Sequence, residues 1–225
     1  MGDIAGIEGI VGTVLRLSLL SPLSSLSAQT PDVRTLLAAA EKAYHASTSF
    51  RAEFVQTIEN PMLGRPEVSR GAMFLNPPDR FAMRFSNPKG DRIVADGSWL
   101  WLFTPSSVAD QVIRQPIPRG GAMTPNFFAQ FLDRPLERYR ATLIGADTVA
   151  GTAVDVVKLV PRIEQPFREA VIAIGKTDRL LRRVSLIEET GQKRVIVLYS
   201  VAAGGVIPDE EFRFRPPNGV RVVTP

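Results

Sequence analysis

The sequence predicts a mainly β protein with a few helices (α+β), built on one large antiparallel sheet that is curled or closed. Short strand-like segments, separated by turn residues, follow one another beyond Ser49 with almost no helix between them. Two amphipathic helical segments are available to cover the sheet. With 225 residues, 44% of them hydrophobic, the chain can bury a substantial core as a single domain.

The first 28 residues differ in composition from the rest and resemble a secretory signal peptide. Arg16 precedes a short apolar stretch, and small residues lead to Ala28 in "VLRLSLLSPLSSLSA". The stretch is too short and too rich in serine to span a membrane. We therefore expect export, with cleavage after Ala28 and a single domain over residues 29–225. A disordered cytoplasmic tail is the alternative.

A helix is expected directly after this segment. Thr30 can cap it and Pro31 suits its first position. Its apolar face consists of residues at helical spacing: Val33, Leu36, Leu37, Ala40 and Tyr44. His45, the only histidine, lies at the end of the helix, and we interpret it as a surface or capping residue because no second histidine or nucleophile motif accompanies it.

The strands that follow alternate between apolar and polar faces. Phe50, Ala52, Phe54 and Gln56 share one face of the first strand. The segment "RFAMRF" repeats the pattern, with Phe81, Met83 and Phe85 opposite Arg80, Ala82 and Arg84. Further strands are expected at residues 69–75, 91–95, 98–104, 108–114, 139–145, 152–160, 168–174, 180–188, 193–202 and 210–215.

One predicted hairpin, "RIVADGSWLWLF", is unusual because its second strand is apolar on both faces. Asp96-Gly97 favours a type I′ turn, in which both central residues need positive φ. An ordinary antiparallel strand shows one polar face to water. Both faces of this strand therefore have to be covered by other parts of the molecule.

A second helix is predicted within "AMTPNFFAQFLDRP", starting at Thr124-Pro125. Its apolar stripe consists of Phe127, Phe128, Phe131 and Leu132. The preceding "QPIPRGGAM" favours an irregular, mobile loop, so residues 124–133 are predicted to form a lid with its hinge at Gly120-Gly121. The alternative is a fixed core helix, with no cavity between helix and sheet.

Several functions are disfavoured by the composition. The chain has no cysteine, and its net charge of +4 is scattered rather than clustered, so we expect no nucleic-acid partner. The segment "AVIAIGKT" (170–177) has Ala170 where a phosphate-binding loop needs glycine, and it is interpreted as a hairpin turn. Nothing selects a catalytic residue, a cofactor or a metal site, so the chain is expected not to be an enzyme.

Four stretches in order, "SFRAEFVQT", "GAMFLNPPDRFAMRF", "IVADGSWLWLF" and "FRFRPPNGVRVV", resemble the outer-membrane lipoprotein carrier (LolA) family. This resemblance implies an incomplete, unclosed β-barrel with a helical lid and an apolar interior that holds acyl chains. The absence of cysteine favours the soluble carrier over its lipid-anchored receptor relatives. The expected lipid-binding residues are Phe50, Phe54, Phe81, Met83, Phe85, Trp99, Trp101, Phe103, Phe127, Phe128 and Phe131.

The resemblance also implies a function and partners. The chain would be a monomeric periplasmic chaperone that carries acylated lipoproteins from an inner-membrane ABC transporter towards the outer membrane, and to a receptor there if one is present. The alternatives are a periplasmic lipid- or lipoprotein-sensing regulatory domain and a lipid hydrolase built around His45. One departure is that Pro77 stands where the family has a basic residue that latches the lid. Arg70, Arg80 and Arg119 are candidates for a different latch.

Overall fold

The computed structural model describes residues 32–62, 64–117 and 126–225, which belong to one compact unit, Pro31–Pro225. The predicted signal peptide and the predicted hinge at Gly120-Gly121 lie outside the described residues. Among the helices that are described, none is both long enough and apolar enough to cross a membrane.

The first helix, α1 (Val33–His45), is present as predicted but is capped by a different residue. The Asp32 carboxylate accepts a hydrogen bond from the Thr35 backbone N–H at 3.4 Å. Asp32 therefore takes the capping role expected of Thr30, which lies outside the described residues, as does Pro31. The predicted apolar face buries Leu36, Leu37, Ala40 and Tyr44.

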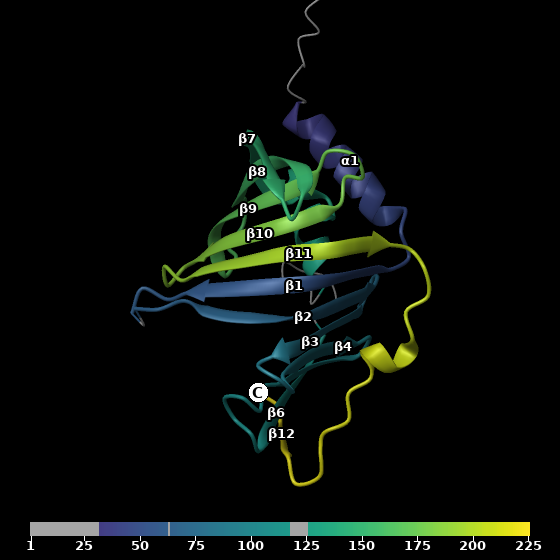
Figure 1. Cartoon of the computed structure of the whole chain (residues 1–225), viewed down its shortest axis with the longest axis vertical. Coiled ribbons are helices and arrows are strands. Elements are labelled where there is room, and N and C mark those ends of the chain that lie inside the picture. The colour runs from purple at the N-terminus through teal and green to yellow at the C-terminus, as the bar shows by residue number, and fades with distance from the viewer. Residues whose placement is uncertain (1–31, 63, 118–125) are drawn as a thin grey trace, which may run out of the picture. The chain divides into compact units, whose positions relative to one another are not determined.

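The architecture is a single 12-stranded sheet (Figure 1), in the order β12-β6-β5-β4-β3-β2-β1-β11-β10-β9-β8-β7. Because β12 and β7 form two separate edges, the sheet is not closed, and all of its pairs are antiparallel except β12 with β6. The strands are β1 (Phe50–Glu59), β2 (Glu67–Asn76), β3 (Arg80–Asn87), β4 (Arg92–Asp96), β5 (Trp99–Phe103), β6 (Gln111–Pro116), β7 (Tyr139–Val149), β8 (Thr152–Pro161), β9 (Phe167–Gly175), β10 (Leu181–Glu188), β11 (Lys193–Ala203) and β12 (Arg221–Val223).

The prediction of an antiparallel sheet with covering helices is confirmed, but the prediction of a strand at residues 210–215 is wrong. Residues 210–215 do not form a strand: the chain makes a 3₁₀ helix, η1 (Asp209–Phe212), and then runs on without sheet pairing. The last strand is instead β12, which lies parallel to β6. The two remaining helices are α2 (Phe127–Leu132) and α3 (Pro135–Arg138). α3 has no counterpart among the predicted elements.

The Asp96-Gly97 hairpin forms between β4 and β5, with a different turn from the one predicted. Ala95 pairs with Leu100, and only Gly97 has a positive φ, of 99°. A type I′ turn is therefore excluded, and Gly97 occupies the position where a type II′ turn places glycine. The Asp96 carboxylate closes the turn by accepting hydrogen bonds from the backbone N–H groups of Ser98 and Trp99.

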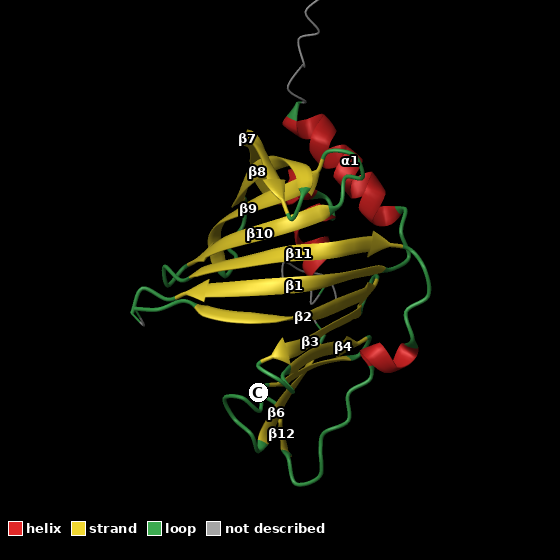
Figure 2. Ribbon diagram, viewed as in Figure 1, coloured by secondary structure: helices red, strands yellow, loops and turns green. Residues whose placement is uncertain are grey.

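The main core lies between one face of the sheet and the helices, and we call this face the inner face. Residues directly opposite each other in antiparallel strands point to the same side, so the register identifies the face across the sheet. Phe50, Leu75 and Phe81 are one such row, which continues through Ala95 to Leu100. Figure 2 shows helical segments behind the strands. Phe128 and Phe131 of the second helix, α2, join the same apolar cluster.

The opposite, outer face of β3–β5 is covered by the C-terminal segment. Phe212, which has no exposed surface, packs with Ala82 and Val94 in a separate cluster. The ring centroid of Phe214 lies 5.5 Å from that of Trp101. Figure 1 shows this yellow segment running beside β4. The second apolar face of the "WLWLF" strand is thus covered by residues that lie far away in the sequence.

Candidate functional site

The candidate site is the apolar layer between the inner face of the sheet and helices α1 and α2. Aromatic rings form its centre: Phe50 stacks on Phe128 with centroids 5.1 Å apart, and Tyr44 stacks on Phe50 at 5.6 Å. On the other side of α2, Phe131 contacts Phe167 at 6.1 Å. The helix therefore places aromatic side chains against both halves of the sheet.

Eight of the eleven predicted lipid-binding side chains meet in this layer. They are Phe50, Phe54, Phe81, Met83, Phe85, Phe127, Phe128 and Phe131. Phe81 and Met83 are almost fully buried, as the alternation of "RFAMRF" predicts. Arg80 and Arg84 lie on the other face, where they pair with Asp209 and Glu211 of the C-terminal segment. The predicted orientation of this strand is therefore confirmed.

The other three predicted residues, Trp99, Trp101 and Phe103, do not share this lining. Trp101 is paired with Val94 and Phe103 with Arg92, both on the outer face, while Leu100 and Leu102 point inward. Trp101 also donates a hydrogen bond to Asp96 at 2.8 Å. Alternation within "WLWLF" therefore places these three predicted residues on the outer face, apart from the other eight.

Gly71 allows two aromatic rings to meet across a strand. It is paired with Phe54 on β1 and with Phe85 on β3, and the rings of these two residues contact each other edge to face at 5.1 Å. A Cβ atom at this position would overlap the backbone carbonyl oxygen of Arg84. Glycine is thus required for the close approach of β2 and β3 at this point of the layer.

Helix α2 is attached to the rest of the site by Asn126, the residue that caps it. The Asn126 side chain accepts from the Ala129 backbone N–H at 3.0 Å and donates to the Tyr44 hydroxyl at 2.9 Å and to the Pro78 carbonyl at 3.3 Å. Asn126 is the N-cap of this helix, whereas Thr124-Pro125, the predicted start, lies outside the described residues. Burial raises the pKa of Tyr44 to about 12, the hydrogen bond from Asn126 opposes this, and the Asp133 charge adds to it.

Further polar contacts hold the C-terminal end of α2. The Tyr139 hydroxyl donates to the Gln130 carbonyl at 2.8 Å, and Arg138 donates to the Ala129 carbonyl at 3.2 Å. Tyr139 thus supplies a donor near the C-terminal end of the helix, and Arg138 adds a second donor to the Ala129 carbonyl, which also accepts from the Asp133 backbone N–H. Burial raises the pKa of Tyr139, although the nearby Arg138 charge opposes the shift. Both residues follow α2 closely in the sequence, but no sequence pattern indicated this role.

Of the latch candidates from the sequence, Arg80 does not hold α2, and Arg70 lies exposed on β2. Arg80 pairs with Asp209 on the outer face at 2.9 Å, so it is directed away from the helix. Arg119 lies outside the described residues. Where the family has a basic residue, Pro77 offers no side-chain donor, and the neighbouring Pro78 instead supplies its carbonyl as the acceptor for Asn126.

The layer is filled by the protein's own side chains. Phe50, Phe54, Phe128 and Phe131 expose at most 1% of their surface. A recess of about 370 Å³ lies at the β4–β5 turn, lined by Asp79, Gly97, Ser98, Trp99, Pro116 and Ile117, but it is outside this aromatic centre. Among the described residues, the side chains at this centre therefore have to move before a large apolar ligand can occupy it.

The protein is thus an open antiparallel sheet with helices packed on its inner face. This arrangement defines a class of proteins with an apolar interior between sheet and helices. The sequence profile of the family described as "Outer membrane lipoprotein carrier protein LolA" matches residues 45–215. This chain belongs to that family.

Two curated relatives show the extent of the similarity. The outer-membrane lipoprotein carrier protein of Methylibium petroleiphilum is 25% identical over 174 residues, which cover 77% of this chain and 81% of the relative. The protein of the same name from Halorhodospira halophila is 29% identical over 157 residues, covering 69% and 70%. The similarity therefore extends over most of both chains.

Two solved structures show the same fold at low sequence identity. An uncharacterized conserved protein from Thermus thermophilus has a TM-score of 0.54 at 14% identity and matches over 85% of this chain and 98% of its own. The structure of MucB has a TM-score of 0.51 at 16% identity, over 83% of this chain and 64% of its own. At such identities the likeness establishes the fold alone.

Proposed function

We propose that this protein is a periplasmic carrier that encloses the acyl chains of lipoproteins between its sheet and α2. The observation that carries the proposal is the aromatic layer, in which a six-residue helix covers the inner face of an open sheet. Membership of the lipoprotein carrier family supports this reading. The sequence signals for export, over residues 1–28, support the periplasmic location.

The energetics of lipid transfer explain why such a layer is needed. Burying an acyl chain is worth roughly 0.8 kcal/mol per methylene, so a sixteen-carbon chain in water costs about 12 kcal/mol. Free diffusion of an acylated protein is therefore negligible. A carrier has to replace the contacts of the membrane with its own apolar side chains, and then release the chains to a site that binds them better.

The residues of α2 are suited to a helix that covers the inner face of the sheet and is displaced by the ligand. In the closed state Phe128 and Phe131 occupy the centre of the layer, which keeps these aromatic surfaces away from water. A helix of six residues has little stability without its packing partners. Acyl chains that enter the layer would take over the contacts of these rings with the sheet, so opening would cost less when ligand is present than when it is absent.

The proposal is tested with one lipoprotein in acylated and unacylated forms. The protein, purified without detergent, is mixed with inner-membrane vesicles that carry the acylated form or with the unacylated form in solution, and bound material is identified by mass spectrometry. We expect a complex with the acylated form only. Equal binding of both forms would refute an acyl-chain site. Hydrolysed acyl groups would indicate an enzyme, and stable capture of a regulatory protein would indicate the sensing domain.

A further inference from the structure

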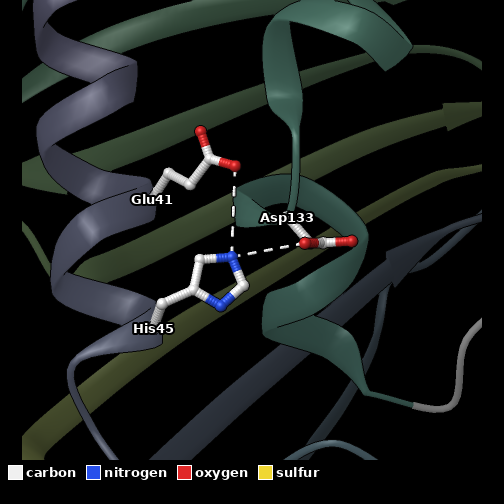
Figure 3. A group of neighbouring side chains, drawn as sticks. All are labelled: Glu41, His45 and Asp133. Carbon is white, nitrogen blue, oxygen red and sulfur yellow. Dashed lines mark ion pairs between the residues drawn. The ribbon is translucent and has the colours of Figure 1, made fainter.

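A cluster of three side chains connects α1 to the end of α2 at the surface (Figure 3). Glu41 and His45 lie one turn apart on α1, and Asp133 follows the last residue of α2. The His45 Nε2 atom is 3.3 Å from Asp133 Oδ1 and 4.0 Å from Glu41 Oε1. One ligand atom from each residue lies within 4.8 Å of the other two.

We propose that Glu41, His45 and Asp133 bind a divalent transition-metal ion of the Zn²⁺ class, which cross-links α1 to α2. An imidazole nitrogen with carboxylate oxygens is a donor set that suits Zn²⁺, whereas Mg²⁺ and Ca²⁺ prefer oxygen donors alone. A spacing of four residues on a helix presents two ligands on one side, as in known helical zinc motifs. This site does not depend on the proposed carrier function.

The distances match a metal polyhedron after small side-chain adjustments. Zinc lies about 2.0–2.2 Å from nitrogen and oxygen ligands, so two ligands of a tetrahedral ion are about 3.3 Å apart. The His45–Asp133 pair already has this separation. The His45–Glu41 pair is longer at 4.0 Å, and rotation of the flexible Glu41 side chain can shorten it. Water would fill the fourth position, because the His45 side chain is 54% exposed.

The Arg134 backbone fixes the orientation of one ligand. Its N–H donates to Glu41 Oε1 at 2.9 Å, which is the kind of outer hydrogen bond that orients a metal-binding carboxylate. The Arg134 guanidinium is 3.7 Å from Asp133 Oδ2, leaving Asp133 Oδ1 directed at the imidazole. The Arg134 side chain is 65% exposed, so it can withdraw into solvent when a cation arrives.

The sequence makes a specific test possible, because His45 is the only histidine and there is no cysteine. The protein is prepared without a histidine tag, and its imidazole ring is followed by long-range ¹H–¹⁵N NMR while ZnCl₂ or MgCl₂ is added. We expect Zn²⁺ to shift the one imidazole spin system and Mg²⁺ to leave it unchanged. Zinc binding measured by calorimetry without an imidazole shift would place the ion elsewhere and overturn the proposal.

Variants test the ligand set and the cross-link. We expect His45→Asn, Glu41→Gln and Asp133→Asn each to weaken Zn²⁺ binding at least about tenfold. Glu137→Gln removes one negative charge, as Glu41→Gln does, but Glu137 is exposed and lies outside the cluster. This control variant should bind Zn²⁺ as tightly as the wild type. In the wild type, Zn²⁺ should slow amide exchange of Asp133, whose N–H bonds to the Ala129 carbonyl in α2. Equal affinity in all four variants, or unchanged exchange in the zinc-bound wild type, would refute the proposal.

Discussion

Truncation of Phe128 to alanine distinguishes a movable cover from a fixed core helix. Phe128 exposes none of its surface, and its ring stacks on Phe50 at 5.1 Å and contacts Phe127 at 6.3 Å. Removing a fully buried phenylalanine side chain typically costs about 3–5 kcal/mol. If α2 opens independently of the sheet, the substitution lowers the free energy of opening α2 by this amount. The free energy of unfolding the strands then changes much less.

The assay is hydrogen exchange at single amides. In α2 the N–H groups of Gln130 and Asp133 bond to the carbonyls of Asn126 and Ala129, both at 3.1 Å. A docking loss of about 3–5 kcal/mol predicts that these two amides exchange about 10²–10⁴ times faster in the variant. We expect amides in the centre of β10 and β11 to change by less than about tenfold.

Phe212→Ala is the matched control. Phe212 is the same residue type with the same 0% exposure, but it packs on the outer face, away from α2. Truncating Phe212 should weaken the packing of the C-terminal segment on the sheet. The amide exchange of Gln130 and Asp133 and the retention of an acylated ligand should both stay unchanged. If Phe128→Ala instead accelerates the α2 and strand amides equally, α2 is part of the cooperative core and the reasoning is wrong.

Further predictions follow from other parts of the site. Burial raises the pKa of Tyr44 from about 10 to about 12, because it disfavours the ionised phenolate. Protonated Tyr44 therefore favours the folded state below pH 10, and this stabilisation is lost as the pH rises towards 12. Denaturant unfolding at pH 8 and pH 11 should show a smaller difference in Tyr44→Phe than in wild type. Gly71→Ala should lower the free energy of unfolding by about 2 kcal/mol or more, because its Cβ overlaps the Arg84 carbonyl, and an unchanged midpoint in urea would contradict this. Phe81→Glu should impair lipoprotein transfer far more than Arg84→Glu on the opposite face, in a vesicle-to-acceptor transfer assay. Periplasmic protein should begin at Gln29 in an intact mass spectrum, and detection of residues 1–28 on it would exclude cleavage after Ala28.

The fold was largely predictable because its strands carry their own signal. Alternation in β1 and β3 identifies the inner residues, and turn residues mark most of the hairpins. The C-terminal region misleads because Phe212 and Phe214 alternate with arginine as they would in a strand. Their real partners, Val94 and Trp101, lie on distant strands, and no local pattern reveals that packing. The three residues of β12 are too few to show any periodicity.

The site was predictable in its apolar residues and less so in its polar ones. Within "WLWLF" both faces are apolar, so only the register with β4 shows that Leu100 points inward and Trp101 outward. Asn126 precedes an apolar stripe and is a favoured N-cap residue, so the sequence did contain a signal for it, in competition with Thr124-Pro125. The contacts of Asn126 with Tyr44 and Pro78 join three separate elements and depend on the tertiary fold.

The central claim is that acyl chains lie between α2 and the inner face of the sheet, and site-specific photo-crosslinking tests it most directly. A photoreactive phenylalanine analogue is placed at Phe127 or Phe85, which are partly buried on the inner side, or at Phe214, which packs on the outer face. Each protein is loaded with a lipoprotein carrying radiolabelled acyl chains and irradiated. The account predicts labelling at Phe127 and Phe85 and none at Phe214. Equal labelling at all three positions, or labelling at Phe214 alone, would contradict it.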